Sequence, residues 1–341
     1  MSVVVATEAE RKRALALEAA DGYLVTTRPW DVRWLLCGRG RPVDSSSPVA
    51  GYTIVLDGER ARVLYPDIEH PRVPLEEHLD ELGFELESYP WHEGHGLEQT
   101  PTVLDTLRLE LGEEERERYR DAGADATAVM REVLRGLYPE MSELDAAGDL
   151  ASKARRRGFT TPVVLVAGDQ RQRIHRHPLP TAAALGSHAL LAITAEREGL
   201  HVSLTRLASF GPPPEELRRL AASAAEVDAV MLGASVPGTT TGDILAIAAA
   251  AYEAQGFPEE WRRHHQGGLT GYRGREVFAV PSENTPLPRS CAVAWNPSIT
   301  GGAKSEDTAL VTEDGVEIVT RTADLGEIET TGLPRPAIVE L

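Results

Sequence analysis

The sequence has few of the residues that mark several common classes of protein. Only two of its 341 residues are cysteine, Cys37 and Cys291, and they form neither a CxxC motif nor a plausible disulfide framework. Basic residues are also scarce, at 35 Lys and Arg against 53 Asp and Glu, which gives a formal charge of −18. A phosphate backbone or an anionic membrane would repel such a chain outside any local basic patch. We therefore expect neither nucleic acid nor a membrane as a partner.

Long apolar runs are missing as well. The longest, near residues 244–251, is too short to span a bilayer. The first residues run straight into the charged segment Glu8–Arg13, which does not resemble a signal peptide. These features lead us to expect a cytoplasmic protein.

The pattern of apolar residues and turns predicts two α/β domains joined near residues 94–101. The first domain covers residues 1–111, with predicted helices at 8–20 and 75–82, strands at 21–27 and 85–89, and a hairpin at 52–65. The second covers residues 112–327, followed by a tail at 328–341. Its predicted elements are helices at 113–137, 141–157, 215–231 and 244–254 and strands at 163–167, 189–194 and 200–207. Ser142 is the expected cap of the second of these helices.

The most informative segment is residues 301–315. Val311 and the β-branched run 316–320 predict a hairpin closed by the turn 313–315. This hairpin places Glu306 at the start of its first strand, where the side chain could face a cavity.

Three other segments, taken together with this hairpin, resemble a known family of proteins. They are His177-Pro-Leu-Pro-Thr, His265-Gln-Gly-Gly-Leu and Trp-Asn296-Pro-Ser. Together with Glu306 they resemble the pita-bread metallopeptidase family, which includes Xaa-Pro aminopeptidase, prolidase, methionine aminopeptidase and the metal-free creatinase. The resemblance implies an α/β (α+β) chain with a smaller creatinase-like N-terminal domain and a C-terminal pita-bread domain. It also implies a homodimer.

The resemblance raises the question of a metal site, because the family holds two divalent ions with two Asp, two Glu and one His. The two aspartates correspond to Thr194 and Ser203, and one glutamate corresponds to Asn296. Only His265 and Glu306 remain. A ligand set that supplies four negative charges in the family here supplies one, so two dications would keep most of their charge uncompensated, at a cost of several kcal/mol per ion.

We therefore expect no dinuclear metal centre and no cofactor. A single zinc ion on His265 and Glu306 would still need a third ligand, which His177 or His201 could supply.

The resemblance and the polar residues define a candidate site of eight residues. The expected catalytic residues are His177, His265 and Glu306, and the expected substrate-binding residues are Thr194, Ser203, Arg206, Tyr272 and Asn296. His177 matches the histidine that creatinase uses as acid and base, and we expect its pKa to lie near neutrality.

The other candidates are assigned supporting roles. His265 and Glu306 would form a second His–carboxylate pair that orients the substrate, while Asn296, Ser203 and Thr194 would donate hydrogen bonds to a developing oxyanion. Each residue also has a structural interpretation. Arg206, for example, could clamp a carboxylate within the fold.

Three functions remain open. The first is a metal-independent hydrolase or lyase that cleaves a C–N bond in a small polar substrate, with neutral or anionic molecules favoured over creatine-like cations. The second is a non-catalytic pita-bread module that binds a small ligand or short peptide. The third is an Xaa-Pro metallopeptidase with an atypical site.

Overall fold

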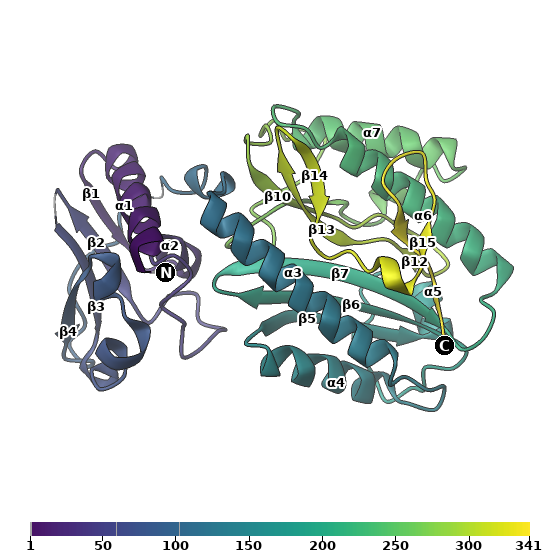
Figure 1. Ribbon diagram of the computed structural model, residues 1–341, viewed down its shortest axis with the longest axis horizontal. Coiled ribbons are helices and arrows are strands. Elements are labelled where there is room, and N and C mark those ends of the chain that lie inside the picture. The colour runs from purple at the N-terminus through teal and green to yellow at the C-terminus, as the bar shows by residue number, and fades with distance from the viewer. Residues whose placement is uncertain (1, 59, 102) are drawn as a thin grey trace. The chain divides into compact units, whose positions relative to one another are not determined.

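The computed structural model describes residues 2–58, 60–101 and 103–341 (Figure 1). The chain divides into two compact units. The smaller unit comprises Met1–Glu115 and Glu198–Leu200, and the larger comprises Arg116–Arg197 and His201–Leu341. All eight candidate site residues belong to the larger unit. No helix in the described ranges combines the length and apolar character that a membrane span requires.

The smaller unit is one four-stranded sheet with helices packed on it. Its strands have the order β1–β2–β3–β4, with β3 and β4 parallel and the other pairs antiparallel. Val25, Val55 and Leu64 form a hydrophobic cluster of buried residues in it. The elements are α1 (Ser2–Ala19), β1 (Tyr23–Thr26), α2 (Pro29–Leu35), β2 (Thr53–Asp57), β3 (Arg60–Pro66) and β4 (Glu85–Tyr89).

The helix predicted at 75–82 is wrong. The chain forms two short turns there, a π-helical turn at Val73–Glu77 and a 3₁₀ turn at Asp80–Leu82. His78 lies between them with φ +48°, a left-handed conformation that no helix continues through. The pattern of apolar residues there is satisfied by two turns instead of one helix.

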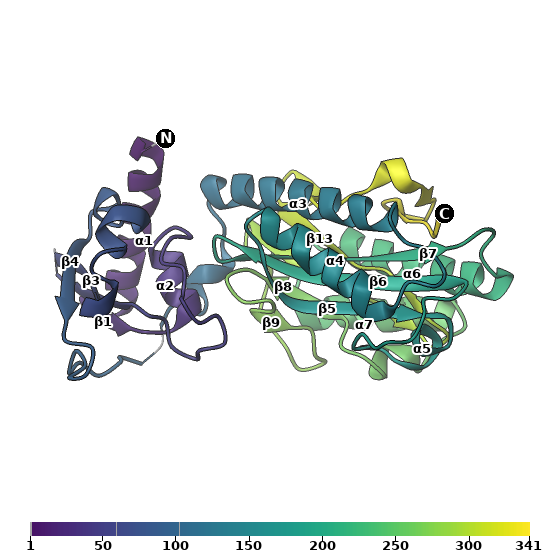
Figure 2. The same ribbon diagram turned by 90° about the horizontal axis from the view of Figure 1, so that it is seen from below.

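The described part of the larger unit contains two main sheets and two short strand pairs, β11–β12 and β15–β16. The first main sheet takes three strands from the N-terminal half of the unit and one, β17, from its C-terminal end. Its strand order is β17–β7–β6–β5, and helix α4 packs along β5 (Figures 1 and 2). The predicted cap is confirmed, because the Ser142 side chain accepts a hydrogen bond from the amide of Asp145 at 3.0 Å. The elements are α3 (Glu113–Leu134), α4 (Glu143–Arg156), β5 (Thr160–Gly168), α5 (Asp169–Ile174), β6 (His188–Arg197), β7 (Leu200–Ser209) and β17 (Val339–Glu340).

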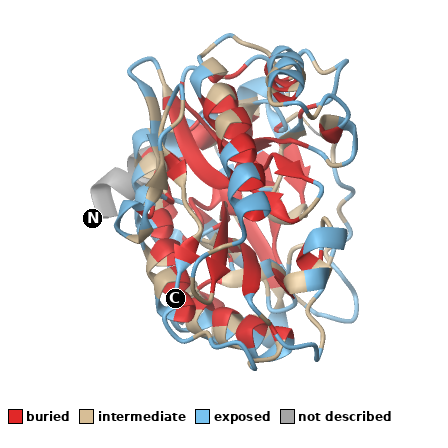
Figure 3. Cartoon of the chain, turned by 90° about the vertical axis from the view of Figure 1, so that its right-hand side faces the viewer, coloured by how far each residue is buried: buried red, intermediate tan, exposed pale blue. Residues whose placement is uncertain are grey.

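The second sheet is antiparallel, with the order β14–β13–β10–β8–β9. Helices α6 and α7 pack on each other, and α6 also contacts β10 and β12. Figure 3 shows that most strand residues are buried, whereas the outer helix faces are exposed. The elements are α6 (Glu215–Ala234), α7 (Thr241–Ala254), β8 (Gly267–Thr270), β9 (Val277–Phe278), β10 (Cys291–Trp295), β11 (Ser298–Ile299), β12 (Ala303–Lys304), β13 (Asp307–Thr312), β14 (Gly315–Ile318), β15 (Glu327–Ile328) and β16 (Arg335–Pro336). The predicted hairpin is thus confirmed as β13 and β14, and Glu306 lies directly before β13.

Candidate functional site

A cavity of about 540 Å³ lies in the larger unit, lined by residues of both sheets. It brings together five of the eight candidate residues, although they are far apart in the sequence: His177, Thr194, His265, Asn296 and Glu306. Ser203, Arg206 and Tyr272 are absent from its described lining. The remaining wall is largely apolar and includes residues of β5, β6 and β9.

Two glycines bring His265 next to Asn296. At Gly267, with φ +99°, a Cβ atom would lie 2.1 Å from the carbonyl oxygen of Ala294. At Gly268, a Cβ would lie 2.0 Å from the carbonyl oxygen of Val277. Only glycine allows β8 to lie this close to β10 and β9. His265 lies two residues before β8 and Asn296 immediately follows β10, so the antiparallel pairing of the two strands brings both residues to one edge.

The His177 segment is anchored by a buried carboxylate. Glu143, which is fully buried at the start of α4, accepts hydrogen bonds from the amides of Gly168 (3.0 Å) and Thr181 (2.9 Å). It also accepts one from the Thr181 hydroxyl at 2.7 Å and forms an ion pair with Arg171. These bonds fix the loop that carries His177 to the end of β5.

His177 is part of a cluster of three imidazoles. Its Nε2 lies 2.8 Å from Nε2 of His264, so one of the two rings donates a hydrogen bond to the other. The ring of His264 stacks on that of His265, with centroids 4.3 Å apart. One nitrogen from each of the three rings lies within 4.8 Å of the others.

Glu306 is held by two cations and a hydroxyl. Its carboxylate accepts a hydrogen bond from Thr205 at 2.6 Å and forms ion pairs with Lys304 (3.1 Å) and Arg275 (3.3 Å). The side chains of Lys304 and Glu306 are 6% exposed and that of Arg275 is 10% exposed. Burial alone would raise the pKa of Glu306, but Lys304, Arg275 and the Thr205 hydroxyl together hold it below its ordinary value. The carboxylate is therefore ionised.

Burial, with a smaller contribution from these cations, keeps the imidazoles neutral. Burial is the main cause that lowers the pKa of all three rings, and the charge of Lys304 adds to the effect in each case. The pKa falls to about 2 for His264 and to about 4 for His265, where Arg275 contributes more than Lys304. The pKa of His177 also lies below its ordinary value. Each ring is thus a neutral base near pH 7, and the expectation of a near-neutral pKa for His177 is corrected downward.

The expected pair between His265 and Glu306 does not form. Among the described residues, the partners of the Glu306 side chain are Thr205, Lys304 and Arg275. The two residues face the same cavity, but the carboxylate is already engaged.

The two positions that correspond to the family aspartates form a neutral hydroxyl pair. Oγ1 of Thr194 lies 2.9 Å from Oγ of Ser203. Thr194 lines the cavity, whereas Ser203 lies behind it, 1% exposed, with its amide bonded to the hydroxyl of Thr308 at 2.7 Å. We therefore assign only Thr194 of this pair to the proposed site.

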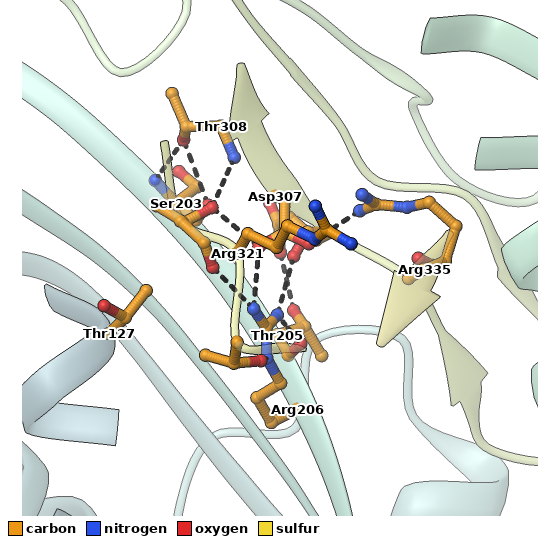
Figure 4. A network of polar contacts seen from close by, with 12 residues as sticks. Thr127, Ser203, Thr205, Arg206, Asp307, Thr308, Arg321 and Arg335 are labelled. Carbon is orange, nitrogen blue, oxygen red and sulfur yellow. Dashed lines mark hydrogen bonds and ion pairs between the residues drawn. The ribbon is translucent and has the colours of Figure 1, made fainter. Parts of the chain in front are cut away.

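Arg206 lies on the other side of β13 from the cavity. Glu306 and Asp307 are successive residues, and Arg206 donates a hydrogen bond to Asp307 at 2.8 Å and one to the carbonyl of Thr320 at 2.7 Å (Figure 4). Arg335 binds the second oxygen of Asp307 at 2.7 Å. These bonds tie the start of β13 to β7, so Arg206 positions Glu306 from behind.

Tyr272 is also outside the lining. It is 4% exposed, and its hydroxyl accepts a hydrogen bond from Arg118 at 3.3 Å. This contact is structural in kind. We leave both Arg206 and Tyr272 out of the proposed substrate-binding set.

These contacts do not suit a pair of divalent ions. Thr194 and Ser203 supply no charge, and the carboxylate of Glu306 is occupied by Lys304 and Arg275. Two dications would have to displace two side-chain cations from the only acidic residue in the described lining. The donor set therefore does not fit the dinuclear centre.

Three residues of this site were not among the predicted site residues: His264, Arg275 and Lys304. Lys304 is two residues from Glu306, and the sequence suggests it as an ion-pair partner of that carboxylate, but it gives no sign that the pair is buried. Arg275 lies in the glycine-rich segment after β8, and His264 looks like one half of a surface pair. Only the tertiary fold shows that all three converge.

Comparison with known proteins identifies the family to which this chain belongs. Residues 117–313, more than half of the chain, match metallopeptidase family M24, and the chain belongs to that family. It is 22% identical to the Xaa-Pro dipeptidase of Pyrococcus furiosus over 320 residues, which are 81% of this chain and 89% of the relative. It is 26% identical to the probable dipeptidase PepE of Mycobacterium tuberculosis over 222 residues, 62% of this chain and 59% of the relative.

Solved structures agree with this assignment. The Xaa-Pro dipeptidase from Bacillus anthracis superposes with a TM-score of 0.74 at 16% identity and covers 99% of this chain and 100% of that one. The dipeptidase PepE from Mycobacterium ulcerans gives 0.75 at 19% identity, with 98% and 99% coverage. These matches confirm the predicted α/β fold of a pita-bread domain with a smaller N-terminal domain.

Proposed function

We propose that this chain is a metal-independent hydrolase or lyase that cleaves a C–N bond in a small polar substrate. The observation that carries the proposal is the ion pairing of Glu306 with Lys304 and Arg275 inside the cavity. These two side chains supply positive charge beside the residue that the family uses as a metal ligand. The relatives named as dipeptidases support hydrolysis of an amide bond as the reaction class.

The chemistry rests on His177, because its ring lines the cavity as a neutral base. In hydrolysis it would take a proton from water as the oxygen attacks the carbon, and then give that proton to the leaving nitrogen. His264, 2.8 Å away, would exchange the proton with it. Thr194 would donate a hydrogen bond to the oxyanion, and Lys304 would stabilise its charge.

We also propose a cellular location, an oligomeric state and domain boundaries for the chain. Its acidic composition and two cysteines support a cytoplasmic location, and the family resemblance supports a homodimer. Residues 1–111 would form the N-terminal domain, 112–327 the catalytic-type domain and 328–341 a tail.

Turnover and metal content can be measured on one preparation, purified without chelator. The substrates are Xaa-Pro dipeptides, N-acyl amino acids and ureido acids, with products detected by mass spectrometry. We expect turnover without bound metal, and His177→Ala should lower kcat by about 10²–10⁴-fold, the usual contribution of a general base. His175→Ala is the matched control, because His175 is only two residues away but lies outside the described cavity lining.

Each outcome distinguishes between functions. About two Mn, Zn or Co ions per chain, as a dinuclear centre requires, would establish the metallopeptidase instead. One ion per chain, lost in a His264→Ala variant, would locate a mononuclear site on the three imidazoles. Ligand binding with no turnover of any substrate would favour the binding module. Full activity in both His177→Ala and Glu306→Ala would disprove the proposed mechanism.

A further inference from the structure

The positive and negative charges of the side chains in the cavity lining do not cancel. The described lining contains two cations, Lys304 and Arg275, and one carboxylate, Glu306. The two cations outnumber the carboxylate by one, so a positive charge remains in a chain whose formal charge is −18. Among the described residues, Glu306 is the only ion-pair partner of Lys304, which leaves N–H bonds of its ammonium group available. An anion is the partner that these groups lack.

Asn296 supplies a second feature. It is 2% exposed and lines the cavity, and its Oδ1 has no hydrogen-bond partner among the described residues. A buried acceptor of this kind is costly unless a donor reaches it. An amide N–H of a bound molecule would meet that need.

The rest of the described cavity wall is largely apolar. It is formed by side chains of β5, β6, β9 and the loop after His177, and it includes Val163, Leu165, Leu179, Ile193 and Phe278. Such a wall favours an aliphatic side chain over a second polar group. The volume of about 540 Å³ lies in the range of small-molecule sites.

We infer that the substrate is an N-acylated amino acid or a related small amide with one free carboxylate, an apolar side chain and no free amino group. The carboxylate binds Lys304 and the guanidinium of Arg275, and the amide N–H donates to Oδ1 of Asn296. The inference rests on the proposed function, for which it names the substrate class. It departs from a dipeptide, because a free ammonium group placed beside Lys304 and Arg275 meets, in the described lining, only the carboxylate of Glu306, which is already paired.

Binding to the full chain can test this with three matched probes. N-acetyl-L-leucine carries the carboxylate and the amide, N-acetyl-L-leucinamide lacks the negative charge, and glycyl-L-leucine adds a positive charge. We expect calorimetry to show that the two last probes bind at least about tenfold more weakly than the first, the smallest effect of losing one hydrogen bond to a charged group.

Variants locate the contact. Lys304→Met should weaken the binding of N-acetyl-L-leucine by at least about tenfold and remove its preference over the amide. The matched control is Lys153→Met, since Lys153 lies on α4, outside the cavity lining, and pairs with Asp149. It should leave both affinities unchanged.

The inference is overturned if the carboxamide binds as tightly as the carboxylate, if glycyl-L-leucine binds best, or if none of the probes binds. These results are separate from the proposed function. Selective binding of N-acetyl-L-leucine without turnover would support the anion site and disprove the proposed enzymatic function. Turnover of neutral amides that depends on His177 would support the enzymatic function and disprove the anion site.

Discussion

Neutralising Glu306 should destabilise the protein more than the loss of its own hydrogen bonds suggests. In Glu306→Gln the side chain keeps its size, but Lys304 and Arg275 lose the carboxylate that pairs with both. Their side chains are 6% and 10% exposed, so water cannot replace it fully. Removing one partner of a buried ion pair costs about 3–5 kcal/mol. We expect the lower end of this range, because the cavity is open to solvent on one side.

Urea denaturation at pH 7 measures the effect as a change in the free energy of unfolding. The matched control is Glu317→Gln, whose partner Arg120 lies 3.0 Å away with both side chains close to half exposed. Exposed pairs contribute at most about 1 kcal/mol. The slopes of the transitions should agree between variants, so that the comparison reports stability and not a change in the unfolded state.

Lys304→Met completes the comparison. It removes the surplus positive charge and leaves Glu306 paired with Arg275, so we expect the free energy of unfolding to be preserved or increased, in contrast to Glu306→Gln. The double variant should be less destabilised than the sum of the two single variants, since residues in direct contact couple by about 0.5–3 kcal/mol. If Glu306→Gln costs no more than Glu317→Gln, the cavity screens its charges as bulk water does, and the case for paired side-chain cations at this site fails.

Two further results should follow from the site's construction. Because His264 and His265 stay neutral in the folded state but protonate near pH 6.5 when unfolded, the unfolded chain binds more protons below that pH, and the free energy of unfolding should fall as the pH drops from about 6.5 toward 4. A pH-independent free energy of unfolding over that range would contradict the burial of these rings. Gly267→Ala should lower the melting temperature more than Gly211→Ala, since both glycines have positive φ but only the first would place a Cβ against the carbonyl of Ala294. Equal losses would show that β8 can move away from β10.

The sequence predicted the convergence of His177, His265, Asn296 and Glu306 because each belongs to a motif whose place in the fold is set by the family resemblance. It could not predict which polar residues near them are structural. Arg206 looked like a substrate ligand, and its partner Asp307 lies 101 residues away. Successive residues of a strand point to opposite faces, so only the fold shows that Glu306 faces the cavity and Asp307 faces Arg206.

The sequence also could not predict which charged side chains are buried. Local sequence suggests that Lys304 and Arg275 are solvated, because such side chains are seldom buried unless they are paired. Their burial depends on Glu306, which lies directly before β13, whereas Arg275 lies between β8 and β9. Predicting it would have required knowing the pairing of β8, β10 and β13 beforehand.

A pocket that had simply lost its metal would be expected to fill with neutral or solvated groups, yet this one holds two nearly buried cations against one carboxylate. An unmatched charge in such a place destabilises the fold. A bound carboxylate would remove that penalty, so stability and ligand affinity should depend on the same residue. Lys304→Met would then improve or preserve the stability of the ligand-free protein while abolishing its preference for anions, a trade between stability and activity that is typical of functional sites. A structural lysine would lose stability on the same substitution and leave ligand selectivity unchanged.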